Sequence, residues 1–115
     1  MADIKKDLIY AAGTDNGAAG DKITTASGNT YYIPMKREQS MGLVVVGGTG
    51  AAKITLKAGT EYKKSLGDNT IDVAAGKAVV IPLCDSARYK IGKGDYAGCI
   101  AFTTTAAVDV IPFVI

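Results

Sequence analysis

The residue types that could carry out chemistry are few in this 115-residue chain, which contains no histidine. Histidine is the commonest general base, completes the usual serine and cysteine triads and is the commonest metal ligand. Four aspartates could pair for acid–base catalysis, but each lies in or beside a predicted turn, where the backbone favours this residue type; they are Asp68, Asp72, Asp85 and Asp95. The sequence therefore predicts no catalytic residues, no cofactor, no metal site and no enzymatic activity.

Two glycine-rich segments resemble nucleotide-binding loops only superficially. Residues 47–53 end in Ala52-Lys53 and lead into a predicted strand, whereas a phosphate-binding loop needs Gly-Lys followed by Ser or Thr at the start of a helix. Residues 92–98 miss the dinucleotide-binding fingerprint by one position and also precede a predicted strand. We interpret both segments as turns, and Gly47–Gly50 as a hairpin turn.

The elements that would position any functional residues are predicted to be β-strands. Hydrophobic residues make up 48% of the chain and charged residues 21%, which is typical of one globular domain. Fourteen glycines, many threonines and short Val/Ile runs indicate strands joined by tight turns. We predict an all-β sandwich of about eight strands, a jelly roll or a related Greek-key fold, with an immunoglobulin-like sandwich as the alternative.

Individual strands differ in how clearly they alternate. In residues 52–58, Ile54 and Leu56 point to one face, and lysines and threonine point to the other, which predicts a half-exposed strand. Residues 89–91 are predicted to form another short strand. Residues 47–50 and 74–77 supply the turns on either side of this region.

Three predicted strands are apolar on both faces and therefore need cover on both sides: residues 43–46, 78–83 and 108–115. One face can be covered by the other sheet, and the second by a loop or a neighbouring subunit. This pattern predicts self-association. For the last strand, the predicted oligomer interface consists of Val110, Ile111, Phe113 and Ile115.

The N-terminal segment differs in texture from the rest of the chain. Residues 1–21 end in a stretch of small and turn-forming residues, so we predict a flexible N-terminal arm followed by a sandwich domain over residues 22–115. The alternative, an ordinary first strand plus a loop, stays open. As a docking arm, the segment would add a strand to a partner's sheet edge, and its anchors would be Ile4, Leu8, Ile9 and Tyr10.

The charge pattern and the cysteines bear on partners and location. The net charge of +2 comes from interspersed signs and gives no basic stripe, which argues against a nucleic-acid partner. Asp3 and Asp7 interrupt the only candidate signal sequence, and no stretch predicts a membrane span, so we expect a cytosolic chain with no membrane partner. Cys84 and Cys99 are expected to be buried free thiols, with a disulfide as the alternative.

Five tyrosines allow a second interpretation of the surface: Tyr31, Tyr32, Tyr62, Tyr89 and Tyr96. Together they could form a platform on which sugars stack, or an interface patch. Tyrosine in a thin sandwich more often fills the edge of the core.

The order of segments from residue 42 onward resembles a particular group of proteins. It runs from Gly42-Leu43-Val44-Val45-Val46 through the turn at 47–50, then through Leu66-Gly67-Asp68 and the Ala74-Ala75-Gly76-Lys77 turn to Ile81-Pro82-Leu83. The Ser86-Ala87-Arg88-Tyr89-Lys90 segment and a closing hydrophobic strand follow. Over residues 29 to 115, this pattern resembles small virion proteins of tailed bacteriophages, in particular head decoration or cement proteins.

The resemblance implies a β-sandwich that assembles, often as a trimer, on the outside of a phage capsid and clamps neighbouring subunits. The expected function is that of a structural virion protein, made in the host bacterial cytoplasm, which binds the major capsid protein and stabilises the capsid. The alternative is a carbohydrate-binding or adhesin-type module of a phage tail or a cell surface.

Overall fold

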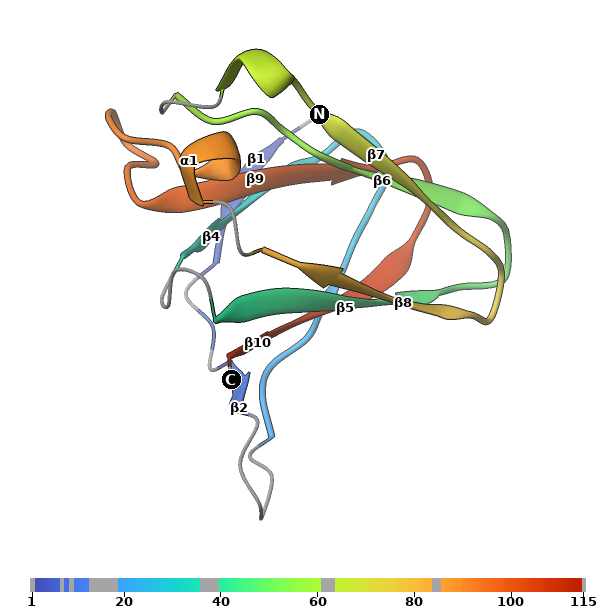
Figure 1. Cartoon of the computed structure of the whole chain (residues 1–115). Coiled ribbons are helices and arrows are strands. Elements are labelled where there is room, and N and C mark those ends of the chain that lie inside the picture. The colour runs from blue at the N-terminus through green and yellow to red at the C-terminus, as the bar shows by residue number, and fades with distance from the viewer. Residues whose placement is uncertain are drawn as a thin grey trace.

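Two β-sheets packed face to face make up the protein in the computed structural model (Figure 1). The structure describes residues 2–6, 8, 10–12, 19–35, 40–60, 64–83 and 86–114. Half of the described residues are in strands and 4% are in helix. The predicted all-β sandwich is therefore confirmed.

Sheet A is the upper layer in Figure 1 and has the strand order β1-β4-β9-β6-β7. Its strands are β1 (Asp3–Lys5), β4 (Thr30–Pro34), β9 (Cys99–Thr104), β6 (Ala52–Leu56) and β7 (Asn69–Val73). The pairs β4–β9, β9–β6 and β6–β7 are antiparallel, whereas β1 joins β4 in parallel. Most neighbours in this sheet are thus distant in the chain.

Sheet B is the lower layer and has the order β2-β10-β5-β8, with β3 also pairing with β10. Its strands are β2 (Ala11–Ala12), β10 (Val108–Val114), β5 (Met41–Gly47), β8 (Ala78–Pro82) and β3 (Ile23–Thr24). The β10–β5 and β5–β8 pairs are antiparallel and extend over most of each strand. Sheet B is therefore built around the last strand of the chain.

The core between the sheets follows the alternation seen in the sequence. On β6, Ile54 and Leu56 are buried while Lys53 is exposed, which confirms the predicted faces of this strand. Phe102 on β9 is fully buried, and its ring stacks on that of Tyr31 at a centroid distance of 5.6 Å. Such an aromatic pair stabilises a core beyond its buried area.

The two glycine-containing turns connect the sheets. Residues 47–50 follow β5 of sheet B and precede β6 of sheet A, and residues 74–77 lead from β7 of sheet A to β8 of sheet B. The prediction of a hairpin at 47–50 is wrong, because β5 and β6 are not paired with each other. The two connections lie side by side, and the Gly76 N–H donates to the carbonyl of Gly48 at 3.0 Å.

The predicted strand at residues 89–91 is also wrong. The chain there forms one helical turn, α1 (Ser86–Tyr89), before an irregular connection to β9. Tyr89 is buried, and its hydroxyl accepts a hydrogen bond from the Asn69 side-chain amide at 3.2 Å. Burial of the tyrosine ring and this bond fix the local conformation, overriding a strand-like sequence.

The N-terminal segment lies along the sandwich and reaches both sheets. Strand β1 pairs with β4 of sheet A, and β2 pairs with β10 of sheet B, so the chain between them spans one side of the molecule (Figure 1). Tyr10, between the two strands, is only 7% exposed, and its hydroxyl donates to the Pro34 carbonyl. The described part of the predicted arm is thus packed on the domain in this conformation.

A carboxylate ties the end of β6 to the start of β7 and gives the fold a pH dependence. Asp68 accepts a hydrogen bond from the Ala58 N–H at 2.7 Å, and its other oxygen lies 3.1 Å from Lys57 Nζ. The Ala58 N–H and then the lysine hold the pKa of Asp68 below its ordinary value of 3.8. Since the folded-state pKa is lowered, this stabilisation is present above pH 3.8 and is lost as the pH falls through the lower value.

We therefore expect Asp68→Asn to lower the free energy of unfolding at neutral pH and to have progressively less effect in acid. Urea titrations from pH 7 downward, with Asp95→Asn in a turn as the comparison, would measure this. A difference between wild type and Asp68→Asn that stays constant at all pH values would contradict the assignment.

Candidate interaction surface

The outer face of sheet B is apolar and forms the candidate site. Strand β5 contributes Val44 and Val46 and strand β10 contributes Ile111 and Phe113, all of them half-buried, while Val80 on β8 is 63% exposed. We call these five side chains the apolar outer face. They point away from the core because the residues between them on each strand, such as Val45, are buried.

The strand registers bring these side chains together. Val44 lies opposite Ile111 on one side and opposite Val80 on the other, so three branched side chains form one row across β10, β5 and β8. Directly opposed residues on one face of a sheet lie within contact distance of each other. The apolar outer face is therefore one continuous patch, and such patches on soluble proteins mark interaction sites.

A glycine seats the aromatic ring of this surface. A Cβ atom built on Gly42 would lie 2.6 Å from Cζ of Phe113 and 2.9 Å from the Ile81 carbonyl oxygen. The Phe113 ring thus occupies the space that a side chain at position 42 would fill. Glycine at this position lets the Phe113 ring pack directly against the backbone of β5.

A polar border limits the apolar outer face at the β3 side of the sheet. Asp109, on the same face of β10, accepts a hydrogen bond from the Thr24 hydroxyl at 2.8 Å. Lys22 Nζ lies 3.6 Å from its other oxygen. An apolar centre with a polar rim is the usual anatomy of a protein interface.

The opposite face of the molecule is polar. Thr30, Thr103, Thr55 and Thr70 share one register across four strands of sheet A. The hydroxyls of Thr55 and Thr70 are 2.9 Å apart. The two outer faces of the sandwich therefore differ in chemistry: that of sheet B is apolar and that of sheet A is polar.

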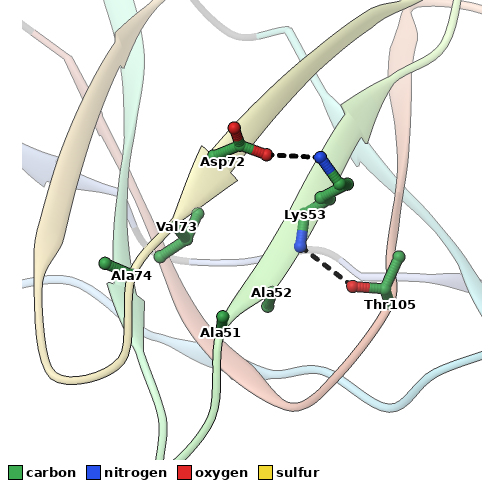
Figure 2. Close-up of a pocket in the computed structure, with 7 residues that line it drawn as sticks. All are labelled: Ala51, Ala52, Lys53, Asp72, Val73, Ala74 and Thr105. Carbon is green, nitrogen blue, oxygen red and sulfur yellow. Dashed lines mark hydrogen bonds and ion pairs between the residues drawn. The ribbon is translucent and has the colours of Figure 1, made fainter.

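A hollow of about 580 Å³ lies where β6 begins and β7 ends (Figure 2). Its polar groups are already engaged: Lys53 Nζ lies 2.6 Å from Asp72 Oδ1, and the Lys53 backbone N–H donates to the Thr105 hydroxyl at 2.9 Å. The remaining lining is small and apolar and consists of Ala51, Ala52, Val73 and Ala74. This lining suits contact with a protein side chain better than a chemical reaction.

The predicted anchors of the arm occupy different environments. Ile4 and Leu8 are half-buried and pack against the domain's own core, and Tyr10 is a member of that core. Ile9 lies outside the described residues. The conformation described thus uses three of the four predicted anchors inside the molecule.

The predicted oligomer interface needs one correction. Val110 is fully buried between the sheets, so its side chain has no surface to offer a second subunit. Ile111 and Phe113 lie on the apolar outer face, and Ile115 falls outside the described residues. Three further residues of this surface were not predicted from the sequence, although their strands are apolar on both faces, which was the signal for them: Val44, Val46 and Val80.

The tyrosines that the structure describes do not gather into one platform. Tyr31 and Tyr89 are buried, and Tyr62 lies outside the described residues. Tyr32 and Tyr96 stack on each other at a centroid distance of 3.7 Å. Burial raises the pKa of Tyr32, and the charges of Asp3 and Tyr96 add to this effect.

The thiol chemistry is equally limited. Cys99 is a buried free thiol. Burial raises its pKa, so less of it is in the reactive thiolate form at neutral pH. Cys84 lies outside the described residues. Within the described ranges, no group of three or more metal-binding side chains occurs, and no helix has the length and apolar character needed to cross a membrane.

Comparison of the chain with protein-family models, with curated proteins and with solved structures found no match.

Proposed function

We propose that this protein is a structural virion protein that binds the outside of a phage capsid in many copies and stabilises it. The observation that carries the proposal is the contrast between the two outer faces of the sandwich. The apolar outer face of sheet B is suited to a protein partner, while the threonine-rich face of sheet A is suited to water.

The geometry favours a broad, shallow contact. Val44, Ile111 and Val80 form a flat row on a sheet, and Phe113 lies over Gly42 beside them. A flat apolar surface of this kind gains free energy from the area that it buries. Each copy can bind weakly, because many copies on one lattice bind with high avidity.

The resemblance of residues 29 to 115 to head decoration proteins supplies the class of partner, a major capsid protein. The position of Tyr10 in the core moves the proposed contact from the N-terminal segment to the body of the domain. The apolar outer face is accordingly the proposed capsid-binding surface, rather than the anchors Ile4, Leu8, Ile9 and Tyr10.

The proposal predicts that Ile111→Asp weakens binding to undecorated capsids of the parent phage. A carboxylate at the centre of the buried face would lose its hydration without gaining a partner, so binding should weaken at least about tenfold. Thr70→Asp places the same charge on the polar face of sheet A and should bind like wild type. Cosedimentation and electron microscopy of the mixtures would measure occupancy, and circular dichroism would confirm that both variants are folded.

Equal capsid binding by wild type and Ile111→Asp would refute the apolar outer face as the contact surface. Absence of capsid binding by the wild-type protein, combined with binding on a glycan array, would instead support the carbohydrate-binding alternative.

A further inference from the structure

We infer that two copies of this chain associate through strand β8, whose free edge pairs antiparallel with β8 of the second copy across a twofold axis at Val80. This inference concerns a contact between copies and does not depend on the proposed capsid function.

The free backbone groups of β8 can be assigned from its pairing with β5. The Gly47 N–H donates to the Lys77 carbonyl, and the Leu83 N–H donates to the Met41 carbonyl, so residues 77 and 83 direct their backbone groups toward β5. Backbone groups alternate in direction along a strand. Ala78, Val80 and Pro82 therefore direct theirs away from the sheet.

No strand covers this side of β8 among the described residues, because β8 ends the order of sheet B. Within that part of the chain, the N–H groups of Ala78 and Val80 have no backbone partner. Pro82 has no N–H to offer. The edge thus presents two donors, at Ala78 and Val80, and three carbonyl acceptors.

A second β8 matches this set when Val80 lies opposite the second copy's Val80. Each Val80 then donates to the other's carbonyl, and each Ala78 N–H donates to the carbonyl of the opposing Pro82. Both exposed donors of each copy are satisfied, and the Ala78 carbonyl, which faces Pro82, is left to accept from water. Other registers would leave a donor opposite no acceptor or shorten the ladder.

The side chains also match in this register. On the outer face, Val80 meets Val80, and the row with Val44 and Ile111 continues into the same row of the second copy. On the inner face, the half-buried Val79 meets the buried Ile81 of the second copy. The paired sheets would therefore present one apolar surface twice as wide.

Charge distinguishes β8 from the other free edge on this side of the sandwich. Strand β7 ends sheet A and carries Asp72, whose side chain is 81% exposed, so self-pairing of β7 would bring two carboxylates together. Charged residues on an edge strand prevent such pairing. Strand β8 has no charged residue, and antiparallel pairing keeps the two flanking Lys77 residues at opposite ends of the ladder.

The contact is small, since it consists of one five-residue strand from each copy. Stable interfaces bury about 1,200–2,000 Å² in total, and smaller ones belong to transient complexes. The association is therefore expected at roughly 0.1–1 mM, which sedimentation equilibrium or concentration-dependent NMR can measure.

Val80→Pro tests the ladder without touching the bonds between β8 and β5, because it removes only an outward N–H and proline is tolerated on edge strands. We expect dimers for wild type and at least about a tenfold weaker association for Val80→Pro, from the loss of two hydrogen bonds at the dimer axis. Val80→Thr retains the N–H and should still dimerise. Thr70→Pro, the matched change on the outward side of β7, should leave association unchanged.

Hydrogen exchange of the wild-type protein gives a readout that needs no variant. The amides of Ala78 and Val80 should become protected as concentration rises, while those of Thr70 and Asp72 should not. A monomer at about 1 mM, a trimer unaffected by Val80→Pro, or unchanged exchange at Ala78 and Val80 would each overturn the inference. The two proposals fail in different ways. Loss of capsid binding by Ile111→Asp tests the capsid contact, and loss of dimers by Val80→Pro tests the β8 contact.

Discussion

Replacing Tyr10 with alanine is expected to lower the free energy of unfolding by about 3–5 kcal/mol, the range measured when large buried aromatics are truncated. Tyr10 lies between β1 and β2, is 7% exposed and belongs to the core cluster. Its hydroxyl donates to the Pro34 carbonyl. The variant would lose both the ring contacts and this bond, and it would leave the carbonyl of Pro34 without its donor.

Tyr10→Phe is the matched control, because it keeps the ring and removes only the hydroxyl. It should cost about 1 kcal/mol, the usual net value of one hydrogen bond. Urea denaturation of both variants would provide the free energies. If Tyr10→Ala were as stable as wild type, the N-terminal segment would be an independent arm, as the sequence first predicts.

The packing of the N-terminal segment also changes the stability expected of a truncated chain. Removal of residues 1–20 from a flexible arm would leave the melting temperature nearly unchanged. Because β1 and β2 pair with both sheets and Tyr10 fills the core, the truncated protein should instead melt well below the full chain.

Replacing Phe102 with alanine is expected to cost about 3–5 kcal/mol as well, and to lower the melting temperature by more than about 10 °C in a domain of this size. Phe102 is fully buried at the centre of sheet A and stacks on Tyr31. Removal of its ring opens a cavity. Because hydrogen bonds within each sheet hold the strands in place, the sheets can close that cavity only in part.

Thr103→Ala, one position along the same strand, is the comparison for Phe102→Ala. Thr103 is half-buried and lies on the outer face, so its loss should cost less than about 1 kcal/mol. Differential scanning calorimetry of both variants would test this order. Similar melting temperatures for Phe102→Ala and wild type would show that the core is not where the structure places it.

The strands that alternate in the sequence could be predicted in detail, and those that do not could be predicted only in outline. Ile54 and Leu56 alternate with polar residues, so their inward direction follows from the residue types alone. In β10 every residue except Asp109 is apolar, so both faces of the strand look alike in the sequence. Residue type could not separate Val110, in the core, from Ile111, on the surface.

Long-range pairing set the remaining limits of prediction. Nothing near Ala11 in the sequence shows that it pairs with Phe113, since the pairing depends on how the whole chain crosses between sheets. The turns at 47–50 and 74–77 are evident from their glycines, but a turn does not reveal whether the next strand joins the same sheet. The position of Val80 on an exposed edge depends on the same crossings.

The position of β10 has a consequence for how the protein is made. This strand is synthesised after the other strands of the sandwich, yet it lies between β5 and β2 and also pairs with β3, so sheet B lacks its central member until residues 108–114 are made. Before that moment, β5 and β8 form at most a two-stranded ribbon, which is marginally stable in water. Folding of the sandwich on the ribosome should therefore be completed only after β10 leaves the exit tunnel. Nascent chains stalled before Val108 should remain sensitive to protease along their whole length.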